Sequence, residues 1–498
     1  MTTTPPTPPT TTAAATARPP RSRPSHSRIR RSRIRRSTGI ALTALLVAAA
    51  GAPPATAAPD GQRPRHLTGT LGSGAAYVID VPAAWNGTML LFSHGYRPKG
   101  SDNPAVDAPD QATRALLLRR GYALAGSSYA TTGWAAEQAV PDQLHTLDAF
   151  TRRIGPSRRT LAWGESYGGL VTTAIAERHA DRIDGSLAMC GLVHGGVANW
   201  NNTLDPVYAL KTLLAPRSGV PLTGFANQTE AKAAATALSG TVERAQDTGT
   251  GRARIALAAA LHNIPAWNDP DRPRPAPGDH TGQERAQYPV VRSLIAGPAF
   301  SWRQEAEARA GGNPSWNTGV NYTAMLRRSA NYRQVKALYK AAGRSLRTDL
   351  RTLAKAPRTG ADPAAVAYLA RNAAFTGRLT EPQLDVHTIG DPLVPVQTES
   401  AYRRAVTRAG SARNLRQAYV NNAGHCTFSP GEFTASVKAL DHRVGTGHWG
   451  NASPASLNSA ARLADPTSPA RFLPYRPGPY PRPYELPAPP SPTSPAET

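Results

Sequence analysis

The most informative stretch of the chain is residues 161–170, Leu-Ala-Trp-Gly-Glu-Ser-Tyr-Gly-Gly-Leu. The run 159–163 predicts a strand, residues 164–168 form a Gly-x-Ser-x-Gly turn, and residues 170–176 predict a helix. Gly-x-Ser-x-Gly can occur by chance in a Gly- and Ala-rich chain. Between a strand and a helix, however, the motif indicates a nucleophilic serine. The two flanking glycines let backbone pack against backbone, which holds Ser166 in a strained conformation with its hydroxyl exposed above the sheet.

Two backbone amides are candidates for binding negative charge beside this serine. The helix after Ser166 directs its N-terminal amides, beginning with that of Tyr167, toward the serine. The second amide is expected from His94-Gly95-Tyr96, which follows an apolar strand at 88–93. Because Gly95 permits a close backbone approach, we expect the N–H groups of Tyr96 and Tyr167 to form an oxyanion hole.

Strand-like and helix-like segments alternate along the chain from about residue 60. Strands are expected at 75–81, 88–93, 122–127, 159–163, 185–190, 384–389 and 415–420, and helices at 111–120 and 143–154. This alternation predicts an α/β fold with a mostly parallel sheet and helices on both faces. Residues 206–375 are mainly helical in pattern, which indicates a helical cap inserted into the sheet domain. Trp302, Trp316 and Tyr322 are candidates for an aromatic surface in that cap or for its core.

An acid and a histidine follow the last two predicted strands. Asp391 comes directly after the strand ending at 389, and His425 lies on a loop just past the strand ending at 420. Carboxyl ends of parallel strands meet at one edge of a sheet, so both side chains are expected near Ser166, in the order Ser, Asp, His. Asp205, a candidate helix N-cap at the start of the cap, is the alternative acid. His145, His194 and His387 are less well placed, in a helix, a Gly-rich loop and mid-strand.

The chain has two cysteines, Cys190 at the end of a strand and Cys426 next to His425. Both are expected at the same sheet edge, so a disulfide between them would tether the histidine loop. Two buried free thiols are the alternative, and a protein exported to an oxidising compartment would favour the disulfide.

The net charge of +24 would suit nucleic-acid binding, but the basic residues are scattered. Nine of the 50 Arg residues precede residue 37, in a segment without acidic residues. The remainder has 48 basic and 33 acidic residues and no dense basic block, which indicates solvated surface. We therefore predict no nucleic-acid partner.

The two ends of the chain differ in composition from its centre. A basic run, the apolar residues 40–50 and an Ala-x-Ala sequence predict a signal peptide over 1–57 and a secreted protein, by the Sec or the twin-arginine route. The apolar run is too short to form a stable membrane span. Residues 466–498 contain 12 Pro, so an extended, disordered tail is predicted over 449–498. The expected core therefore comprises 58–205 and 376–448, with the cap at 206–375.

With these motifs, the chain from about 66 to 448 resembles an α/β-hydrolase of the secreted type common in high-GC Gram-positive bacteria. The resemblance rests on four segments: residues 93–96 (Ser-His-Gly-Tyr), 164–169 (Gly-Glu-Ser-Tyr-Gly-Gly), 390–395 (Gly-Asp-Pro-Leu-Val-Pro) and 423–426 (Ala-Gly-His-Cys). It implies an eight-stranded, mostly parallel sheet and a catalytic triad of Ser166, His425 and Asp391.

Two narrower resemblances concern the substrate. The His425-Cys426 pair is similar to a pair in tannases and fungal-type feruloyl esterases, where the cysteine after the catalytic histidine forms a disulfide with one before the serine. In this chain Glu165 precedes the serine, so Cys190 is the partner that remains for Cys426. Gly-Glu-Ser-Tyr-Gly-Gly also resembles serine carboxypeptidases, in which this Glu helps to hold a substrate carboxyl group, although their Asn-Gly-Gly-Pro-Gly-Cys motif is missing.

The expected reaction is acyl transfer to Ser166, with His425 as base, Asp391 stabilising the imidazolium, and water releasing the acyl group. The predicted substrates are small-molecule or polymer-linked carboxylic esters, including aryl or hydroxycinnamoyl (feruloyl-type) esters. An exopeptidase that uses Glu165 is the alternative, and a non-catalytic protein that kept the fold is a third. The sequence contains no metal-ligand cluster or phosphate-binding loop, so no cofactor and no metal are predicted.

Overall fold

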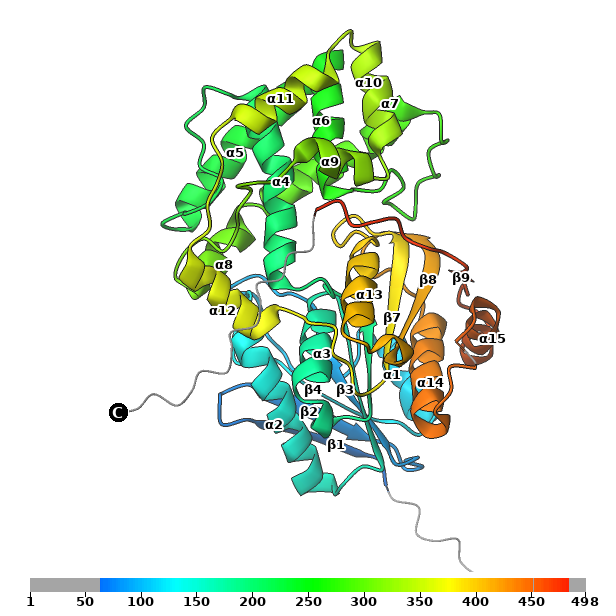
Figure 1. Ribbon diagram of the computed structural model, residues 1–498. Coiled ribbons are helices and arrows are strands. Elements are labelled where there is room, and N and C mark those ends of the chain that lie inside the picture. The colour runs from blue at the N-terminus through cyan, green and yellow to red at the C-terminus, as the bar shows by residue number, and fades with distance from the viewer. Residues whose placement is uncertain (1–62, 451, 483–498) are drawn as a thin grey trace, which may run out of the picture. The chain divides into compact units, whose positions relative to one another are not determined.

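The computed structural model describes residues 63–450 and 452–482, and within them nine strands form a single sheet (Figure 1). The predicted signal peptide over 1–57 lies outside the described residues. The strands are β1 (Arg65–Thr70), β2 (Ala76–Val81), β3 (Thr88–Ser93), β4 (Ala123–Ser127), β5 (Arg159–Glu165), β6 (Gly185–Met189), β7 (Gln383–Gly390), β8 (Leu415–Ala423) and β9 (Phe472–Leu473).

The strand order is β1-β2-β4-β3-β5-β6-β7-β8-β9, and the six strands from β4 to β8 in this order are parallel. β2 is antiparallel to β1 and β4, and β9 is antiparallel to β8. Every residue of β3, β4 and β6 is buried, as expected for parallel strands covered on both faces. The predicted count of eight strands is wrong by one, because residues assigned to the tail return to the sheet and pair with β8.

Helices cover both faces of the sheet with separate apolar cores (Figure 1). One face carries α2 (Ala136–Ile154), α3 (Tyr167–Arg178) and α13 (Thr398–Arg408). The other carries α1 (Gln111–Arg119), α14 (Pro430–Thr446) and α15 (Pro454–Ala464). Two short 3-10 helices, Ala180–Arg182 and Ala412–Asn414, precede β6 and β8.

The chain between β6 and β7, all of it described, is helical and has an apolar core of its own. Its helices are α4 (Gly196–Leu214), α5 (Gln228–Ala245), α6 (Gly249–His262), α7 (His280–Ala296), α8 (Ser301–Ala310), α9 (Tyr322–Arg328), α10 (Tyr332–Ala341), α11 (Leu346–Lys355) and α12 (Pro363–Ala373). The central helix α6 is almost entirely buried because its neighbours surround it, so it lacks a polar face. We call this region the cap.

The first cap helix begins at Gly196, before the expected boundary at 206. Pro206 lies inside this helix, and Asp205 is consequently an interior residue rather than its N-cap. The carboxylate of Asp205 is fully buried and accepts hydrogen bonds from Arg482 and Tyr322, at 2.7 and 2.9 Å. The prediction of an N-cap was wrong because the helix continues through the proline.

The prediction of a disordered tail from 449 is wrong for residues 452–482. α15 and β9 form there, and the chain then runs from the sheet edge to the cap (Figure 1). Tyr480 and Arg482 are buried against α4, although the segment is rich in proline. Proline removes backbone donors, but long side chains supply the burial and hydrogen bonds that hold the segment. Residues 483–498 lie outside the description.

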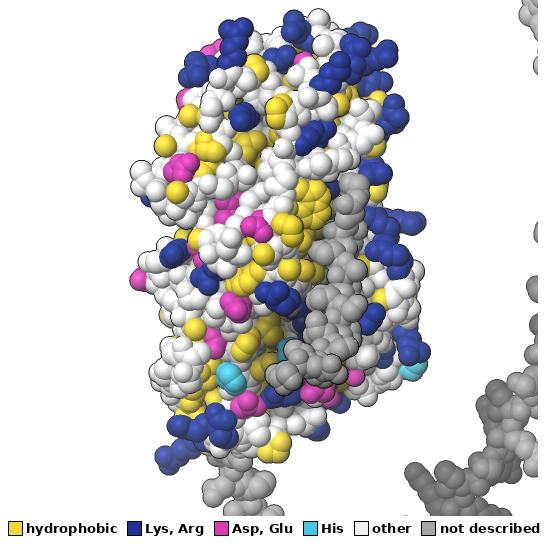
Figure 2. Space-filling view, turned by 60° about the vertical axis from the view of Figure 1, so that its left-hand side comes forward, with side chains coloured by type: hydrophobic (Ala, Val, Ile, Leu, Met, Phe, Trp, Pro, Cys, Tyr) yellow, Lys and Arg dark blue, Asp and Glu magenta, His cyan; other side chains and the backbone are white. Residues whose placement is uncertain are grey.

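Two features of the surface bear on partners. On the face shown in Figure 2, Lys and Arg side chains are spread over cap and core rather than gathered in one patch. No helix among the described residues is both long and apolar enough to cross a membrane.

Candidate active site

Ser166 lies at the sharp turn between β5 and α3, and the two glycines around it are required by close contacts. The serine has φ 55° and ψ −121°, a strained conformation for a residue with a side chain. A Cβ on Gly168 would lie 1.8 Å from the carbonyl oxygen of Ser93, and one on Gly164 would lie 2.6 Å from that of Gly168. The turn can therefore form only with glycine at both positions, and it raises the hydroxyl above the end of the strand.

The structure brings Ser166, His425 and Asp391 together from the ends of β5, β8 and β7. His425 Nε2 lies 2.7 Å from Ser166 Oγ, and His425 Nδ1 lies 2.7 Å from Asp391 Oδ2. Both distances are those of hydrogen bonds, so the imidazole connects the hydroxyl to the carboxylate. When a serine contacts a base and the base contacts an orienting acid, the serine oxygen can act as a nucleophile.

Asp391 is fully buried and is fixed through both of its oxygens. Oδ1 accepts hydrogen bonds from the backbone N–H groups of Leu393 and Val394, each at 2.9 Å, while Oδ2 faces His425. Burial on its own raises the pKa of Asp391, but the imidazoles of His425 and His387 outweigh it and lower the pKa to about 2. The carboxylate is therefore ionised over the whole neutral range.

Behind Asp391 lies a second buried imidazole, that of His387 in β7. Its position within the strand had not predicted a role in the site. His387 Nε2 is 3.5 Å from Asp391 Oδ2, and Nδ1 is 2.8 Å from Glu399 Oε1. Burial lowers the pKa of His387, but the two carboxylates overcome this and raise it to about 10. The ring is thus an imidazolium between two acids. Its position four residues before Asp391 was the available signal, but Glu399 comes from α13 and no local pattern relates it to the site.

The loop that carries Tyr96 is held against the serine by aromatic contacts. The ring of His94 stacks on Tyr129 with centroids 4.0 Å apart, and Tyr129 Oη donates to the carbonyl of His94 at 3.1 Å. A Cβ on Gly95 would be 3.7 Å from that of Ser166, so the two loops touch. Tyr167 is the first residue of α3, which places its amide at the helix N-terminus beside the serine. This arrangement is compatible with the expected pair of oxyanion donors.

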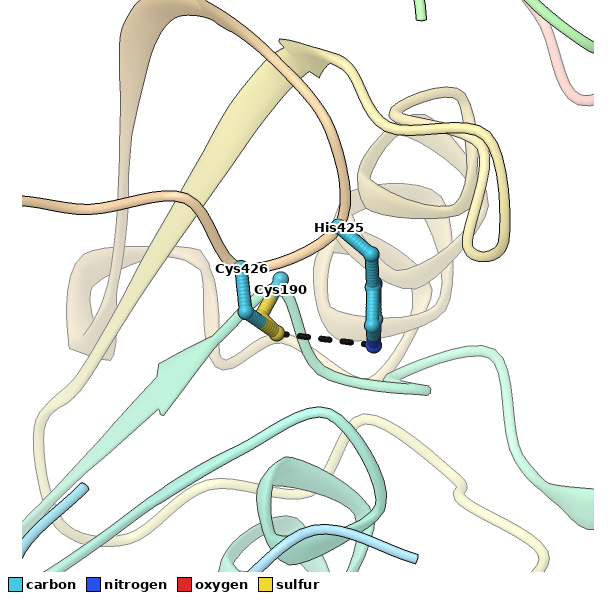
Figure 3. A group of neighbouring side chains, drawn as sticks. All are labelled: Cys190, His425 and Cys426. Atoms are coloured by element: carbon cyan, nitrogen blue, oxygen red, sulfur yellow. Dashed lines mark hydrogen bonds between the residues drawn. A yellow bond between two sulfur atoms is a disulfide. The ribbon is translucent and has the colours of Figure 1, made fainter. Parts of the chain in front are cut away.

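The two cysteines form a disulfide that joins the end of β6 to the histidine loop (Figure 3). Cys426 Sγ lies 3.5 Å from His425 Nε2, on the side of the ring that faces the serine. Cys190, His425 and Cys426 form a compact group of ligand-type atoms. Because the sulfurs are bonded to each other, they do not offer the thiolates that a metal would need.

A cavity of about 420 Å³ opens above Ser166, between the sheet edge and the cap; we call it the Ser166 cavity. Its lining includes aromatic side chains and the aliphatic residues Leu192, Leu294, Pro298, Leu393 and Val394. The rings of Trp302, Tyr96, Tyr167, Trp134 and Trp200 form a continuous series, with successive centroids 4.5, 6.1, 5.0 and 5.0 Å apart. Of the three cap aromatics named from the sequence, Trp302 lines this cavity, whereas Trp316 and Tyr322 lie elsewhere in the cap.

Glu165 also lines the cavity, immediately before the serine. Burial raises the pKa of this carboxyl group to about 7, although the nearby His425 opposes the shift. Glu165 therefore changes charge close to neutral pH.

The sheet order, the strand–Ser–helix turn and the positions of the three polar side chains define an α/β-hydrolase fold. The chain is also similar to known proteins. The chain is 28% identical over 432 residues to o-phthalyl amidase of Xanthobacter agilis, a match that covers 81% of this chain and 93% of the amidase. No protein-family model matches the chain.

Solved structures with a similar fold are more distant in sequence. Feruloyl esterase B from Aspergillus oryzae matches 77% of this chain and 81% of its own, with a TM-score of 0.39 and 15% identity. An acylaminoacyl peptidase of Pyrococcus horikoshii matches 77% of this chain with a TM-score of 0.31 and 12% identity. The chain spans 40% of the length of that peptidase.

Proposed function

We propose that the protein is a secreted serine hydrolase that cleaves carboxylic esters and amides of aromatic acids through an acyl-enzyme intermediate. The observation that carries this proposal is the hydrogen-bonded series from Ser166 through His425 to Asp391, which opens into a cavity with an aromatic wall. The likeness to an amidase named for an aromatic acyl group supports both the inclusion of amides and the aromatic acid.

The proposed reaction uses the hydrogen-bonded series from Ser166 to Asp391. His425 removes the proton of Ser166 as its oxygen attacks the carbonyl carbon, and the backbone amides of Tyr96 and Tyr167 bind the oxygen that becomes negative. Asp391, held ionised by its surroundings, stabilises the imidazolium. His425 then returns the proton to the leaving alcohol or amine, and water repeats the sequence to release the acid.

The cavity size limits the substrate. A volume of about 420 Å³ lies at the lower end of the range for sites that bind small molecules. An aromatic ring is of a size that this cavity can hold, and both aromatic and aliphatic side chains line it. We therefore propose small-molecule substrates, and polymer-linked esters only where the acyl group enters the cavity and the polymer stays outside.

Secretion is part of the proposal. Its support is the basic–apolar–Ala-x-Ala pattern over 1–57 together with the disulfide, since disulfides persist in oxidising compartments.

Exopeptidase activity is the second candidate, favoured by Glu165. A carboxyl group that stays protonated below about pH 7 is able to donate a hydrogen bond to the carboxylate of a peptide substrate. Peptides with a free carboxyl terminus therefore belong in the substrate panel.

The test compares the hydrolysis rates of wild type and Ser166→Ala on three kinds of substrate: 4-nitrophenyl benzoate, N-(4-nitrophenyl)benzamide and short peptides. We expect turnover of the ester and the anilide, with a loss of at least about 10³-fold in the variant. Equal activity in Ser166→Ala would remove the serine from the mechanism. Peptide turnover exceeding that of both benzoyl compounds would favour the exopeptidase.

A further inference from the structure

A further cavity, of about 250 Å³, adjoins the loop that carries Asp391; we call it the second cavity. Residues 393–394 of that loop line the Ser166 cavity, whereas residues 389–391 and 395–397 line the second cavity. The same loop therefore contributes to both cavities. The reaction proposed above makes no use of the second one.

One wall of the second cavity is a cap loop, residues 264–277, between α6 and α7. Near the start of this loop, Asn331 Nδ2 donates to the carbonyl of Ile264 at 2.7 Å. Near its end, Gln283 Nε2 donates to the carbonyl of Ala276 at 2.9 Å. The loop also contains five prolines, each of which restricts φ. Because the loop is held in these ways, the wall exists before any ligand binds.

Three polar side chains that line the second cavity have no hydrogen-bond or ion-pair partner among the described residues: Arg274, Gln397 and Tyr475. The guanidinium carbon of Arg274 lies 5.8 Å from the ring centroid of Trp267. Gln397 is only 7% exposed, and yet its amide atoms are accessible, unlike the sealed polar atoms of the interior. Tyr475, just after β9, is 38% exposed. A ligand in the cavity can therefore contact all three groups.

The charges around the second cavity favour an anion. Among the described residues that line it, Arg274 is the one Lys or Arg and Asp391 is the one acid. Both oxygens of Asp391 are already engaged, by backbone N–H groups and by His425. On the cap loop, Asp269 pairs with Arg272 at 3.2 Å rather than with Arg274. The guanidinium of Arg274 is thus free to bind a carboxylate, whose two oxygens match its paired N–H groups.

We propose that the second cavity is a binding site for a small organic carboxylate. The guanidinium of Arg274 holds the carboxylate, and Gln397 and Tyr475 donate further hydrogen bonds to it. The apolar part of the acid lies against Trp267 and the prolines of the cap loop. A volume of about 250 Å³ is below the range for drug-sized ligands, so the acid has a single ring or a short chain. The proposal goes beyond the proposed function, because it requires no reaction at Ser166.

Calorimetric titration of the full chain with sodium benzoate measures binding directly. Benzamide has the same ring without the charge, and we expect it to bind at least about 10-fold more weakly, the effect of a charged hydrogen bond. Inorganic phosphate, an anion without an apolar part, should also bind more weakly than benzoate. Phosphate that binds as tightly as benzoate would show only anion attraction to an exposed arginine and would contradict the proposal.

Variants then locate the site. Arg274→Gln keeps a polar side chain without the charge and should weaken benzoate binding by at least about 10-fold. Tyr475→Phe removes one hydroxyl and should weaken it by about 3-fold. Arg272→Gln is the matched control, because Arg272 is an exposed arginine of the same loop that does not line the cavity. This control should keep the wild-type affinity.

The Arg274→Gln variant also separates the two cavities. No Lys or Arg lines the Ser166 cavity, so benzoate bound there would not respond to this substitution. Equal benzoate affinity in wild type and Arg274→Gln would therefore overturn the proposal, as would the absence of saturable binding to the wild type. Titration of Ser166→Ala should give the wild-type affinity, which makes the result independent of whether the serine hydrolyses esters.

Discussion

Asp391 is buried between two imidazoles, His425 toward the serine and His387 toward the interior. The imidazolium of His387 is itself held by Glu399, so a chain of alternating charges leads from α13 to the serine. Such a chain fixes the orientation of Asp391 and keeps it ionised by charge attraction in a site from which water is excluded. We therefore regard His387 and Glu399 as positioning residues that act through Asp391.

Glu399→Gln should lower kcat by about 10-fold at neutral pH, with less effect on KM, since the amide keeps a hydrogen bond to His387 but removes the charge. Without this carboxylate His387 loses its proton more readily, so the ring becomes neutral as the pH rises and Asp391 loses its positive neighbour. The loss should therefore deepen as the pH is raised, which a kcat profile between pH 4 and 9 would detect. Glu177→Gln, which changes a partly buried acid that accepts a hydrogen bond from the backbone of Thr376, is the control. An unchanged profile in Glu399→Gln would contradict this role.

Glu165 links protonation to stability. Its pKa is raised from 4.5 to about 7, so between these values the folded protein holds a proton that the unfolded chain releases. The contribution of Glu165 to stability is therefore fully present below about pH 4.5 and is lost as the pH rises through about 7. Relative to Glu165→Gln, the wild type should lose about 2 kcal/mol of unfolding free energy between pH 4.5 and 8.

Urea unfolding at both pH values measures this difference. Glu243→Gln, on the exposed side of α5, is the control and should follow the wild type. A wild type and a Glu165→Gln variant with parallel pH dependence would show that Glu165 titrates normally.

At the scale of elements, the histidine loop is positioned by its connection to β6 rather than by regular structure. The loop leaves β8 through Gly424, which has φ 87°, and the disulfide of Cys426 to Cys190 ties it 236 residues back along the chain. The disulfide is attached at Cys426, the residue next to His425. A disulfide that closes so long a loop stabilises the folded protein mainly by restricting the unfolded chain. Its contribution to the free energy of unfolding is at most about 5 kcal/mol.

The double variant Cys190→Ser/Cys426→Ser should therefore unfold at lower urea concentration, with a loss of up to about 5 kcal/mol, and should lose kcat because the base is less well held. Thiol counting in denatured, unreduced wild-type protein should find no reactive group. Two reactive thiols, or a double variant as active and stable as the wild type, would show that the loop does not depend on the bond.

At the scale of the whole molecule, residues 474–482 connect the far edge of the sheet to the cap (Figure 1). Arg482 is 4% exposed and forms an ion pair with the buried Asp205 of α4 at 2.7 Å. α4 also carries Trp200, so this contact and the cavity wall share one helix. Removing one member of such a pair leaves a buried charge without compensation.

Arg482→Met should destabilise the protein by about 3 kcal/mol, and adding Asp205→Asn should recover much of the loss because the uncompensated charge disappears. Urea unfolding of the single and double variants checks both statements. Arg476→Met, at an exposed position of the same segment, is the control. A single variant as stable as the wild type would show that the segment does not hold the cap.

Local sequence patterns were sufficient to predict many of the strands and the turn at Ser166. Continuous apolar runs marked the parallel strands, and the glycines at 164 and 168 marked the turn, because these depend on backbone geometry within a few residues. Asp391 and His425 were found because parallel strands end at one edge, so chain order and strand ends place them together. The catalytic roles assigned to these residues stay predictions until they are measured.

Other features depended on contacts between distant segments. His387 was visible in its strand, but its charge is stabilised in part by Glu399 of α13. The indoles of Trp134 and Trp200 meet only when the loop before α2 packs against α4. The proline-rich tail looked disordered because its burial comes from Arg482 and Tyr480 reaching another element. By itself the sequence determined the alternation of elements and the turn at Ser166, since short-range sterics and periodicity govern both. Only the tertiary structure decided the buried charges, the cavity wall and the path of the tail, because burial and pairing are properties of residues that meet in space.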